Sequence, residues 1–134
     1  MNALSPYSAQ EHPPARATPA SLYAQSAGSF LLAEGLWGMA SPVVFGVLQT
    51  NRLHAAIHIV VGLYGIAAGL GRETSGYLLC LGTLLLSVGM LYFIPWGNPL
   101  VASLLNVNAP VAALNIALGF GALMLRAFDR SARV

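Results

Sequence analysis

Charged residues are scarce in this sequence: only 7% of its 134 residues are Asp, Glu, Lys or Arg, and lysine is absent. An average soluble domain carries about 25% of these residues. With 57% hydrophobic residues and a mean hydropathy of +0.70, the chain cannot cover a water-facing surface. A soluble globular fold is therefore excluded, and the lipid bilayer is the expected partner of most of the chain.

Clusters of positive charge and cysteines are also missing. The net charge of +2 comes from six scattered arginines, which excludes a nucleic-acid-binding surface. Cys80 is the single cysteine, so an intramolecular disulfide and any multi-cysteine metal site are excluded. Function must therefore depend on apolar segments and on the few polar residues inside them.

Long apolar stretches are what the sequence does contain. A helix needs about 20 apolar residues to cross a bilayer core of about 30 Å. Four stretches meet this requirement, at about Ser21–Met39, His54–Leu70, Gly76–Ile94 and Pro110–Phe128. None alternates polar and apolar residues as the strands of a membrane barrel do. The sequence predicts an all-α integral membrane protein with four transmembrane helices.

The arginines predict the orientation of these helices. Five of the six lie on the side shared by both termini and the central loop: Arg16, Arg72, Arg126, Arg130 and Arg133. Only Arg52 lies on the other side, so the positive-inside rule places both termini in the cytoplasm. Residues 1–19 are predicted to be a disordered cytoplasmic tail, residues 20–128 the membrane domain and residues 129–134 a basic tail.

The sequence also repeats itself. Shifted by 57 residues, segment 42–62 matches segment 99–119, and shifted by 54 residues, segment 23–35 matches segment 77–89. This predicts two tandem parallel hairpin repeats, residues 20–71 and 74–128. Each repeat is expected to carry a short interfacial helix on the outer side. The predicted helix caps are Ser41 and Asn98 before the two interfacial helices, and Asn51 and Asn108 before the second and fourth spans.

Two motifs resemble a known family. They are Asn51-x-x-His54-x-x-x-His58-x-x-x-Gly62, with a weaker second copy, and Thr18-Pro-Ala-x-Leu-Tyr23. Together they resemble a bacterial four-helix membrane family, domain of unknown function 4383, over about residues 18–125. The resemblance implies four spans and a bacterial membrane, which we expect to be an inner or thylakoid-type membrane, and it brings no activity. The second copy departs from the pattern, because Val111 and Asn115 stand where His is expected.

A polar cluster is predicted within the first repeat. Glu34, the only acidic residue inside a span, lies about 9 Å from the outer end of its helix at 1.5 Å per residue. An unpaired carboxylate there costs at least a few kcal/mol, so we expect Glu34 to contact His58 or His54. The second repeat has Val88 and Asn115 instead of Glu34 and His58. The predicted cluster comprises Glu34, Asn51, His54, His58 and Asn115, with Asn115 bonding across to the first repeat.

Several roles are open for this cluster. It can be a structural pair that keeps two helices in register, a proton-linked or substrate-binding site, or an axial ligand site for haem or chlorophyll at His54 or His58. A metal held by His54, His58 and Glu34 has the ligand count of a catalytic zinc site. No nucleophile has a predicted histidine partner, so an enzyme is not expected.

Glycines on one face of each helix predict close helix packing. They are Gly28, Gly35, Gly62, Gly65, Gly69, Gly82, Gly89 and Gly119. We expect most to pack within the bundle, with a homo-oligomer or partner surface as the alternative. The function predicted from the sequence is a structural or accessory subunit of a larger membrane assembly. A haem- or chlorophyll-binding subunit and a small proton-coupled transporter are the alternatives.

Overall fold

The computed structural model describes residues 17–71 and 73–131. Residues 1–16 of the predicted cytoplasmic tail lie outside this range, as do Arg72 and residues 132–134. The helices and strands are α1 (Pro19–Ala40), β1 (Val43–Val44), β2 (Leu48–Gln49), α2 (Arg52–Gly71), α3 (Thr74–Tyr92), α4 (Asn98–Leu105) and α5 (Ala109–Ser131). The described chain is predominantly helical, and the four long helices coincide with the four apolar stretches.

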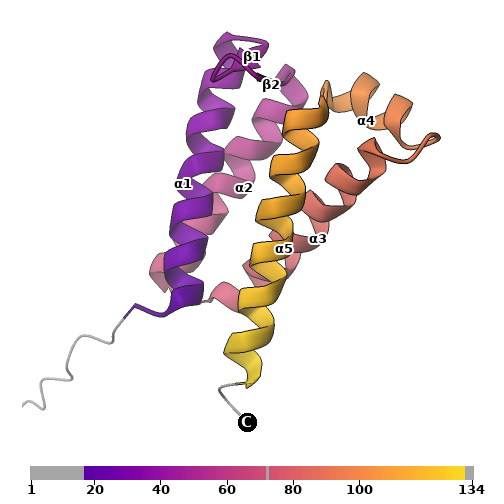
Figure 1. Ribbon diagram of the computed structural model, residues 1–134. Coiled ribbons are helices and arrows are strands. Elements are labelled where there is room, and N and C mark those ends of the chain that lie inside the picture. Colours follow the sequence, from indigo (N-terminus) through magenta and orange to yellow (C-terminus); the bar gives the residue numbers. More distant parts are fainter. Residues whose placement is uncertain (1–16, 72, 132–134) are drawn as a thin grey trace, which may run out of the picture.

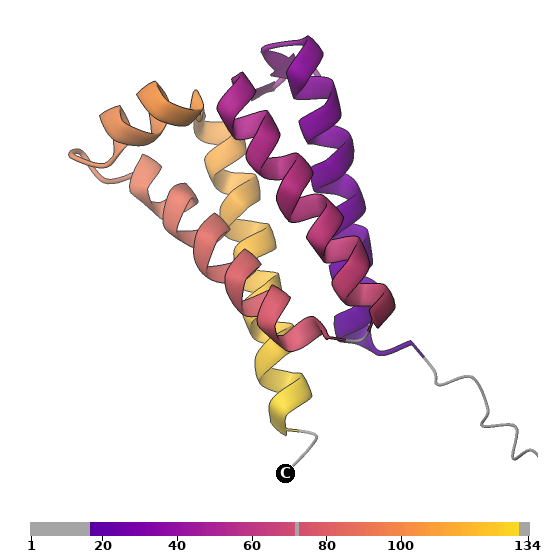
Figure 2. The ribbon, with the colours of Figure 1, turned by 180° about the vertical axis from the view of Figure 1, so that it is seen from behind.

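The long helices form two pairs (Figures 1 and 2). α1 packs along α2, and α3 packs along α5, whereas contacts between the two pairs are fewer. The β1–β2 hairpin and α4 lie at the same end of the molecule, opposite the carboxy terminus. We refer to α1–α2 as the first hairpin and to α3–α5 as the second hairpin.

Three of the long helices, α2, α3 and α5, are long and apolar enough to cross a membrane. α1 has 22 residues, which is sufficient length at 1.5 Å per residue. The mean hydropathy of α1 is lower than that of these three helices because α1 contains Gln25, Ser26 and Glu34.

The start of α1 is defined by its cap. Thr18 Oγ1 accepts a hydrogen bond from Ser21 N at 3.1 Å, and Ser21 Oγ accepts one from Thr18 N at 2.9 Å. This capping box, with Pro19 at the first helical position, satisfies amides that the helix cannot pair internally. Thr18 and Pro19, which were assigned to the tail from the sequence, thus belong to α1 and its cap. At the other end, α5 continues to Ser131, so the first three residues of the predicted basic tail are helical.

Of the two short helices predicted between the long ones, one is present as α4, and the other, expected between Ser41 and Asn51, is not formed. Residues 43–49 form an antiparallel β-hairpin, with Val44 paired to Leu48. Phe45 and Gly46 at its tip have φ of 50° and 75°, the left-handed pair that a type I′ turn requires. At the positions 57 residues further along the chain, Ala102 and Ser103 stand in place of these two residues, and they lie within α4.

Two of the four predicted caps are wrong, each for a different reason. Ser41 ends α1 instead of starting a helix, and its hydroxyl bonds the backbone of Val43. Asn98 is already the first residue of α4, and its Nδ2 donates to Tyr92 O at 2.8 Å. This bond ties α4 back to the end of α3.

Glycine permits the close approach of helices within each hairpin. A Cβ atom added at Gly62 would lie 2.6 Å from Gly28 O, and one at Gly119 would lie 2.7 Å from Leu86 N. A Cβ atom added at any of the eight glycines predicted to pack helices would lie 2.7 Å or less from another atom of this chain. The glycine stripes are therefore occupied within the molecule, so they do not supply the partner surface considered from the sequence.

Candidate functional site

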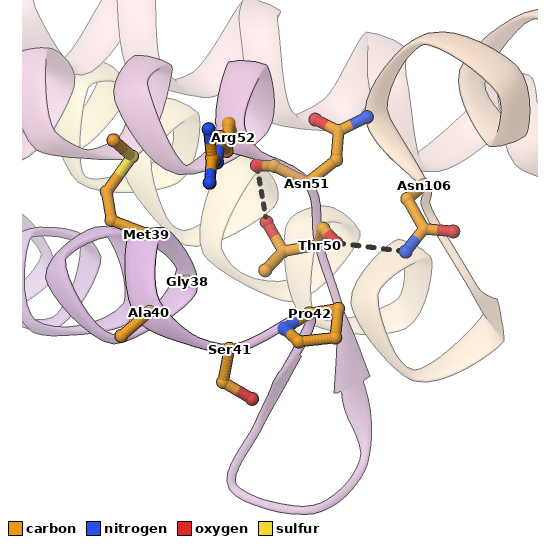
Figure 3. Close-up of a pocket in the computed structure, with 9 residues that line it drawn as sticks. All are labelled: Gly38, Met39, Ala40, Ser41, Pro42, Thr50, Asn51, Arg52 and Asn106. Atoms are coloured by element: carbon orange, nitrogen blue, oxygen red, sulfur yellow. Dashed lines mark hydrogen bonds between the residues drawn. The ribbon is translucent and has the colours of Figure 1, made fainter.

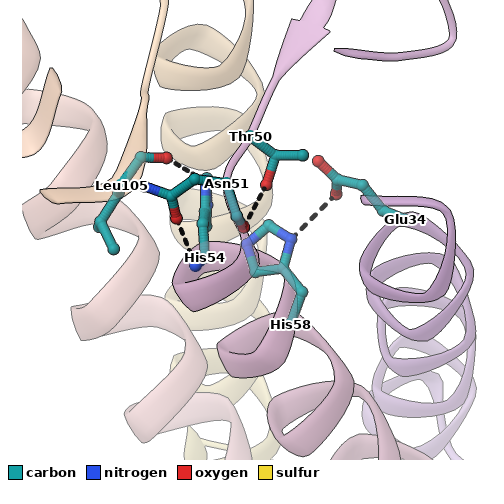
Figure 4. A network of polar contacts seen from close by, with 6 residues as sticks. All are labelled: Glu34, Thr50, Asn51, His54, His58 and Leu105. Atoms are coloured by element: carbon teal, nitrogen blue, oxygen red, sulfur yellow. Dashed lines mark hydrogen bonds and ion pairs between the residues drawn. The ribbon is translucent and has the colours of Figure 1, made fainter. Parts of the chain in front are cut away.

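Glu34 and His58 meet between the two helices of the first hairpin (Figure 4). His58 Nδ1 lies 3.3 Å from Glu34 Oε2, and both side chains are 3% exposed. The distance is that of an ion pair, although the ring N–H does not point at Oε2 with hydrogen-bond geometry. The direct contact expected between Glu34 and a histidine is thus present, and His58 is the partner.

His54 lies one turn from His58 on α2 and faces the second hairpin. Its Nδ1 lies 2.9 Å from Leu105 O at the end of α4, and a carbonyl oxygen can only accept, so Nδ1 carries the proton. The two imidazole rings are edge to face, with centroids 4.3 Å apart. His54 therefore links the Glu34–His58 pair to the backbone of the second hairpin.

Asn51 and Asn108 make equivalent pairs of hydrogen bonds. Asn51 Oδ1 accepts from His54 N at 2.9 Å, and Asn108 Oδ1 accepts from Val111 N at 3.2 Å, which caps α2 and α5 respectively.

The amide nitrogens of the same two residues cross to the opposite hairpin. Asn51 Nδ2 donates to Leu104 O at 2.8 Å, and Asn108 Nδ2 donates to Val47 O at 2.9 Å. Val47 and Leu104 are themselves 57 residues apart, so the exchange is reciprocal. The caps were predicted, whereas the crossing bonds were not. The sequence did contain a signal for these bonds, because the side-chain NH₂ group of each asparagine can still donate once its oxygen caps a helix.

Asn115 lies opposite the histidines. It is 2% exposed, and its Nδ2 has no hydrogen-bond partner among the described residues. It lines a cavity of about 30 Å³ together with His54 and His58 and with apolar side chains that include Val88. The predicted direct bond from Asn115 to the first repeat is therefore not made, although Asn115 does lie beside that repeat.

Two tyrosines that sequence reasoning did not place in the site join the hairpins. Tyr23 Oη donates to Leu118 O at 2.6 Å. Tyr77 is fully buried, and its hydroxyl group has no partner among the described residues. The sequence shows only that both tyrosines lie near helix ends. That the Tyr77 hydroxyl group is buried against Gly65 follows from the tertiary structure.

The polar cluster does not fit a planar cofactor. His54 and His58 are only 2% and 3% exposed. The cavity beside them has about 30 Å³, whereas ligand pockets typically have about 300–1,000 Å³. The described residues also contain no group of three His, Cys, Asp or Glu placed to hold a metal ion, which corrects the arrangement of His54, His58 and Glu34 considered above.

A larger hollow lies beyond the cluster, where α1 ends and α2 begins (Figure 3). It has about 380 Å³ and is lined by Gly38, Met39, Ala40, Ser41, Pro42, Thr50, Asn51, Arg52 and Asn106. The lining polar groups are largely used within the chain: Asn106 Nδ2 donates to Thr50 O at 2.9 Å, and Thr50 Oγ1 donates to Asn51 O at 3.3 Å. This hollow is open and holds one cationic side chain, that of Arg52.

The helices and the buried Glu–His pair define the chain as a helical protein of the membrane type. It belongs to the family described as Domain of unknown function (DUF4383), whose sequence model matches residues 21–128. The family predicted from the Asn51–Gly62 motif is thereby confirmed. Searches of curated proteins and of solved structures give no match.

Proposed function

We propose that this protein crosses a bacterial inner membrane four times, as two duplicated hairpins with both termini in the cytoplasm, and serves as a structural or accessory subunit of a membrane assembly. α1 is the fourth span in this proposal. Its one acidic side chain, Glu34, faces His58 of α2. Because α1 packs along α2, a bilayer that surrounds α2 also surrounds α1.

The duplication is supported by contacts that recur at matched positions. A Cβ at Gly35 would lie 2.7 Å from Ala55 O, and a Cβ at Gly89 would lie 2.7 Å from Ala112 O. The reciprocal bonds of Asn51 and Asn108 follow the same correspondence. Both hairpins then insert in the same sense, as two-span repeats must.

One observation carries the non-catalytic role. The Glu34–His58 pair lies inside the bundle beside a cavity of only about 30 Å³, so it offers no room for an organic substrate. Meanwhile every long helix exposes large apolar side chains, among them Leu36, Val60, Leu84 and Phe120. Such a molecule has an outer surface suited to lipid and to neighbouring membrane helices.

The test is purification of the tagged protein from its native membrane in mild detergent, followed by native mass measurement. A defined species heavier than the protein alone, with fixed stoichiometry and the same partner in independent preparations, supports an accessory subunit. A particle containing a single copy in both native membrane extracts and lipid nanodiscs contradicts it. Reporter fusions after Gly71 and Ser131 test the topology, because both must report the cytoplasm.

A second candidate is favoured by the Glu34–His58 pair itself. Ionisable groups within a membrane often mark proton pathways. In a small proton-coupled transporter, Glu34 and His58 would share and release a proton. Proton flux in proteoliposomes that is present for the native chain and absent for Glu34→Gln would favour this role. Equal flux from protein-free vesicles would contradict it.

A further inference from the structure

We propose that a phospholipid of the outer leaflet binds to the first hairpin, with its phosphate group at Arg52 and one acyl chain along α1 and α2. The site has two parts. One is the open hollow of about 380 Å³ where α1 ends and α2 begins (Figure 3), and the other is an apolar surface that continues from it along both helices. This binding mode rests on the proposed function for its membrane placement, and it is independent of the accessory role.

Arg52 supplies the cationic part of the site. It is the one charged side chain among those that line the hollow, and its guanidinium group makes no hydrogen bond or ion pair with a described residue. The neighbouring Thr50 and Asn106 side chains already bond within the chain. Since a guanidinium group can bind two oxygen atoms of a phosphate at once, an anion of this kind is the ligand that suits Arg52.

The position of Arg52 places this anion at the membrane surface. Arg52 is the first residue of α2, at the end of the molecule opposite the carboxy terminus. Because Cα–Cβ bonds in a helix tilt toward its amino terminus, the Arg52 side chain extends outward from the span. The other described arginines, Arg126 and Arg130, lie in the last turns of α5, toward the opposite end. In the outer leaflet, the anionic group at the level of Arg52 is a lipid phosphate.

The apolar part of the site follows Arg52 along α2. Ile59 lies about two turns after Arg52 and Leu63 about one turn further, which places all three on one face of the helix. Leu63 is exposed, and it lies about 17 Å further along the helix axis than Arg52, at 1.5 Å per residue. One leaflet contributes half of the bilayer core of about 30 Å. This face therefore extends through about one leaflet, as an acyl chain does.

Leu36 continues the apolar surface on α1. A Cβ atom added at Gly35 would lie 2.8 Å from Ile59 Cγ1, so the Ile59 side chain packs against α1 at Gly35. Successive residues of a helix differ by about 100° in direction, so Glu34 and Leu36 project to opposite sides of this contact. Glu34 lies against His58, whereas Leu36 is exposed. The surface that includes Leu36 therefore faces away from the polar cluster and is open to lipid.

The second hairpin has the apolar surface and lacks the charge. Ala109 stands at the position of Arg52, and Phe120 stands at the position of Leu63. Phe120 and Leu63 are both exposed. Nonspecific coverage by lipid tails would therefore treat the two hairpins alike, whereas a lipid phosphate has a cationic partner only at the first hairpin.

The first test measures lipid binding to the full-length chain in detergent by native mass spectrometry, with palmitoyl-oleoyl phosphatidylglycerol as the probe. We expect one lipid to bind more tightly than any further one. Arg52→Gln should weaken this binding about tenfold or more, since the contact joins two charged groups. Arg130→Gln is the control, because it removes the same charge at the other end of the molecule. Equal weakening by both substitutions overturns the proposal.

The second test distinguishes a lipid from a free anion. Diacylglycerol with the same acyl chains lacks the phosphate, and inorganic phosphate lacks the chains. Because the site uses both parts, neither compound is expected to displace phosphatidylglycerol at equal concentration. Displacement by inorganic phosphate would indicate a site for a free anion, and displacement by diacylglycerol would indicate an apolar groove in which Arg52 has no role. Either result overturns the proposal.

The third test locates the acyl chain on the native sequence, so it does not depend on the folding of a variant. Phosphatidylglycerol with a diazirine group in one acyl chain is added to the protein in detergent and photo-crosslinked, and the labelled peptides are identified by mass spectrometry. We expect label around Leu36 and Leu63, and equal labelling of the two hairpins overturns the proposal. If reporter fusions after Gly71 and Ser131 still report the cytoplasm in that case, the membrane placement stands and the lipid site alone is refuted.

Discussion

The two hairpins close their helices in the same way and bury different chemistry between them. Gly35 approaches Ala55 in the first hairpin as Gly89 approaches Ala112 in the second. At the position of Glu34, however, the second hairpin has the apolar Val88. The close packing of an antiparallel helix pair in this protein thus depends on glycine and does not require an ion pair.

The comparison also indicates that the acidic and the basic side chain depend on each other. Glu34 and His58 occur together in the first hairpin, and neither occurs in the second, where Val88 and Asn115 stand. A buried carboxylate without a partner is costly. The pair therefore behaves as one unit, and it can be tested by converting the first hairpin into the second.

The largest effect is expected from such a conversion. His58→Asn leaves Glu34 buried without its partner, which should cost about 3–5 kcal/mol of unfolding free energy. Adding Glu34→Val removes the stranded carboxylate, so the double variant should be more stable than His58→Asn alone. Denaturation by SDS in mixed micelles, followed by circular dichroism, measures both. Additive losses would show that the two side chains act independently.

The next effect concerns the glycines that both hairpins share. A Cβ at Gly62 would meet three backbone atoms at 2.6–3.0 Å, and one at Gly119 would meet Leu86 and Gly82 at 2.7–3.1 Å. We expect Gly62→Ala to cost about 1–3 kcal/mol and Gly119→Ala somewhat less.

Gly76→Ala is the control for this pair, since a Cβ at Gly76 meets nothing within 4 Å. Alanine should leave the stability of the protein unchanged there or raise it, by up to about 1 kcal/mol. The same denaturation series measures all three variants. A loss at Gly76 as large as that at Gly62 would mean that the close approach of the helices is not the cause.

Asn51 and Asn108 should respond almost equally. Each caps its own helix and donates to the other hairpin, so Asn→Ala at either position should cost about 1–2 kcal/mol. Asn51→Asp keeps an oxygen for the cap and loses the donor to Leu104 O, which isolates the crossing bond. Thermal unfolding monitored by tryptophan fluorescence reports these losses. A marked loss at only one of the two positions would contradict their structural equivalence.

The smallest effects distinguish the two tyrosines. Tyr23→Phe removes a donor from Leu118 O and should cost about 0.6 kcal/mol, a typical value for such bonds in membrane proteins. Tyr77→Phe removes a buried hydroxyl that has no partner among the described residues, so stability should stay the same or rise. Melting temperatures of the two variants in one detergent decide the sign. Equal losses would mean that Tyr77 has a partner after all.

Some of the site could be predicted because it depends on spacing along a helix. Glu34 lies about four turns after the start of its helix, and His58 lies about two turns after the start of the next. Because a short connection joins these antiparallel helices, both side chains lie at a similar distance from the connected ends. Asn51 and Asn108 precede apolar helices, which is a local cap signal. The short helix predicted after Ser41 and Pro42 is wrong because Phe45 and Gly46 adopt left-handed φ angles and reverse the chain, which neither the cap signal nor the short apolar stretch behind it reveals.

The amino-acid sequence is sufficient to locate the helical segments, to predict their apolar environment and to predict the pairing of one acidic with one basic side chain. These properties follow from local periodicity, composition and the cost of a lone charge in lipid. The docking of the two hairpins determines which carbonyl oxygens accept hydrogen bonds from the side-chain amides of Asn51 and Asn108. It also determines that the Asn115 amide makes no hydrogen bond to a described residue. The reason is that such contacts depend on how two hairpins dock, to within about an ångström, and no local pattern encodes that distance.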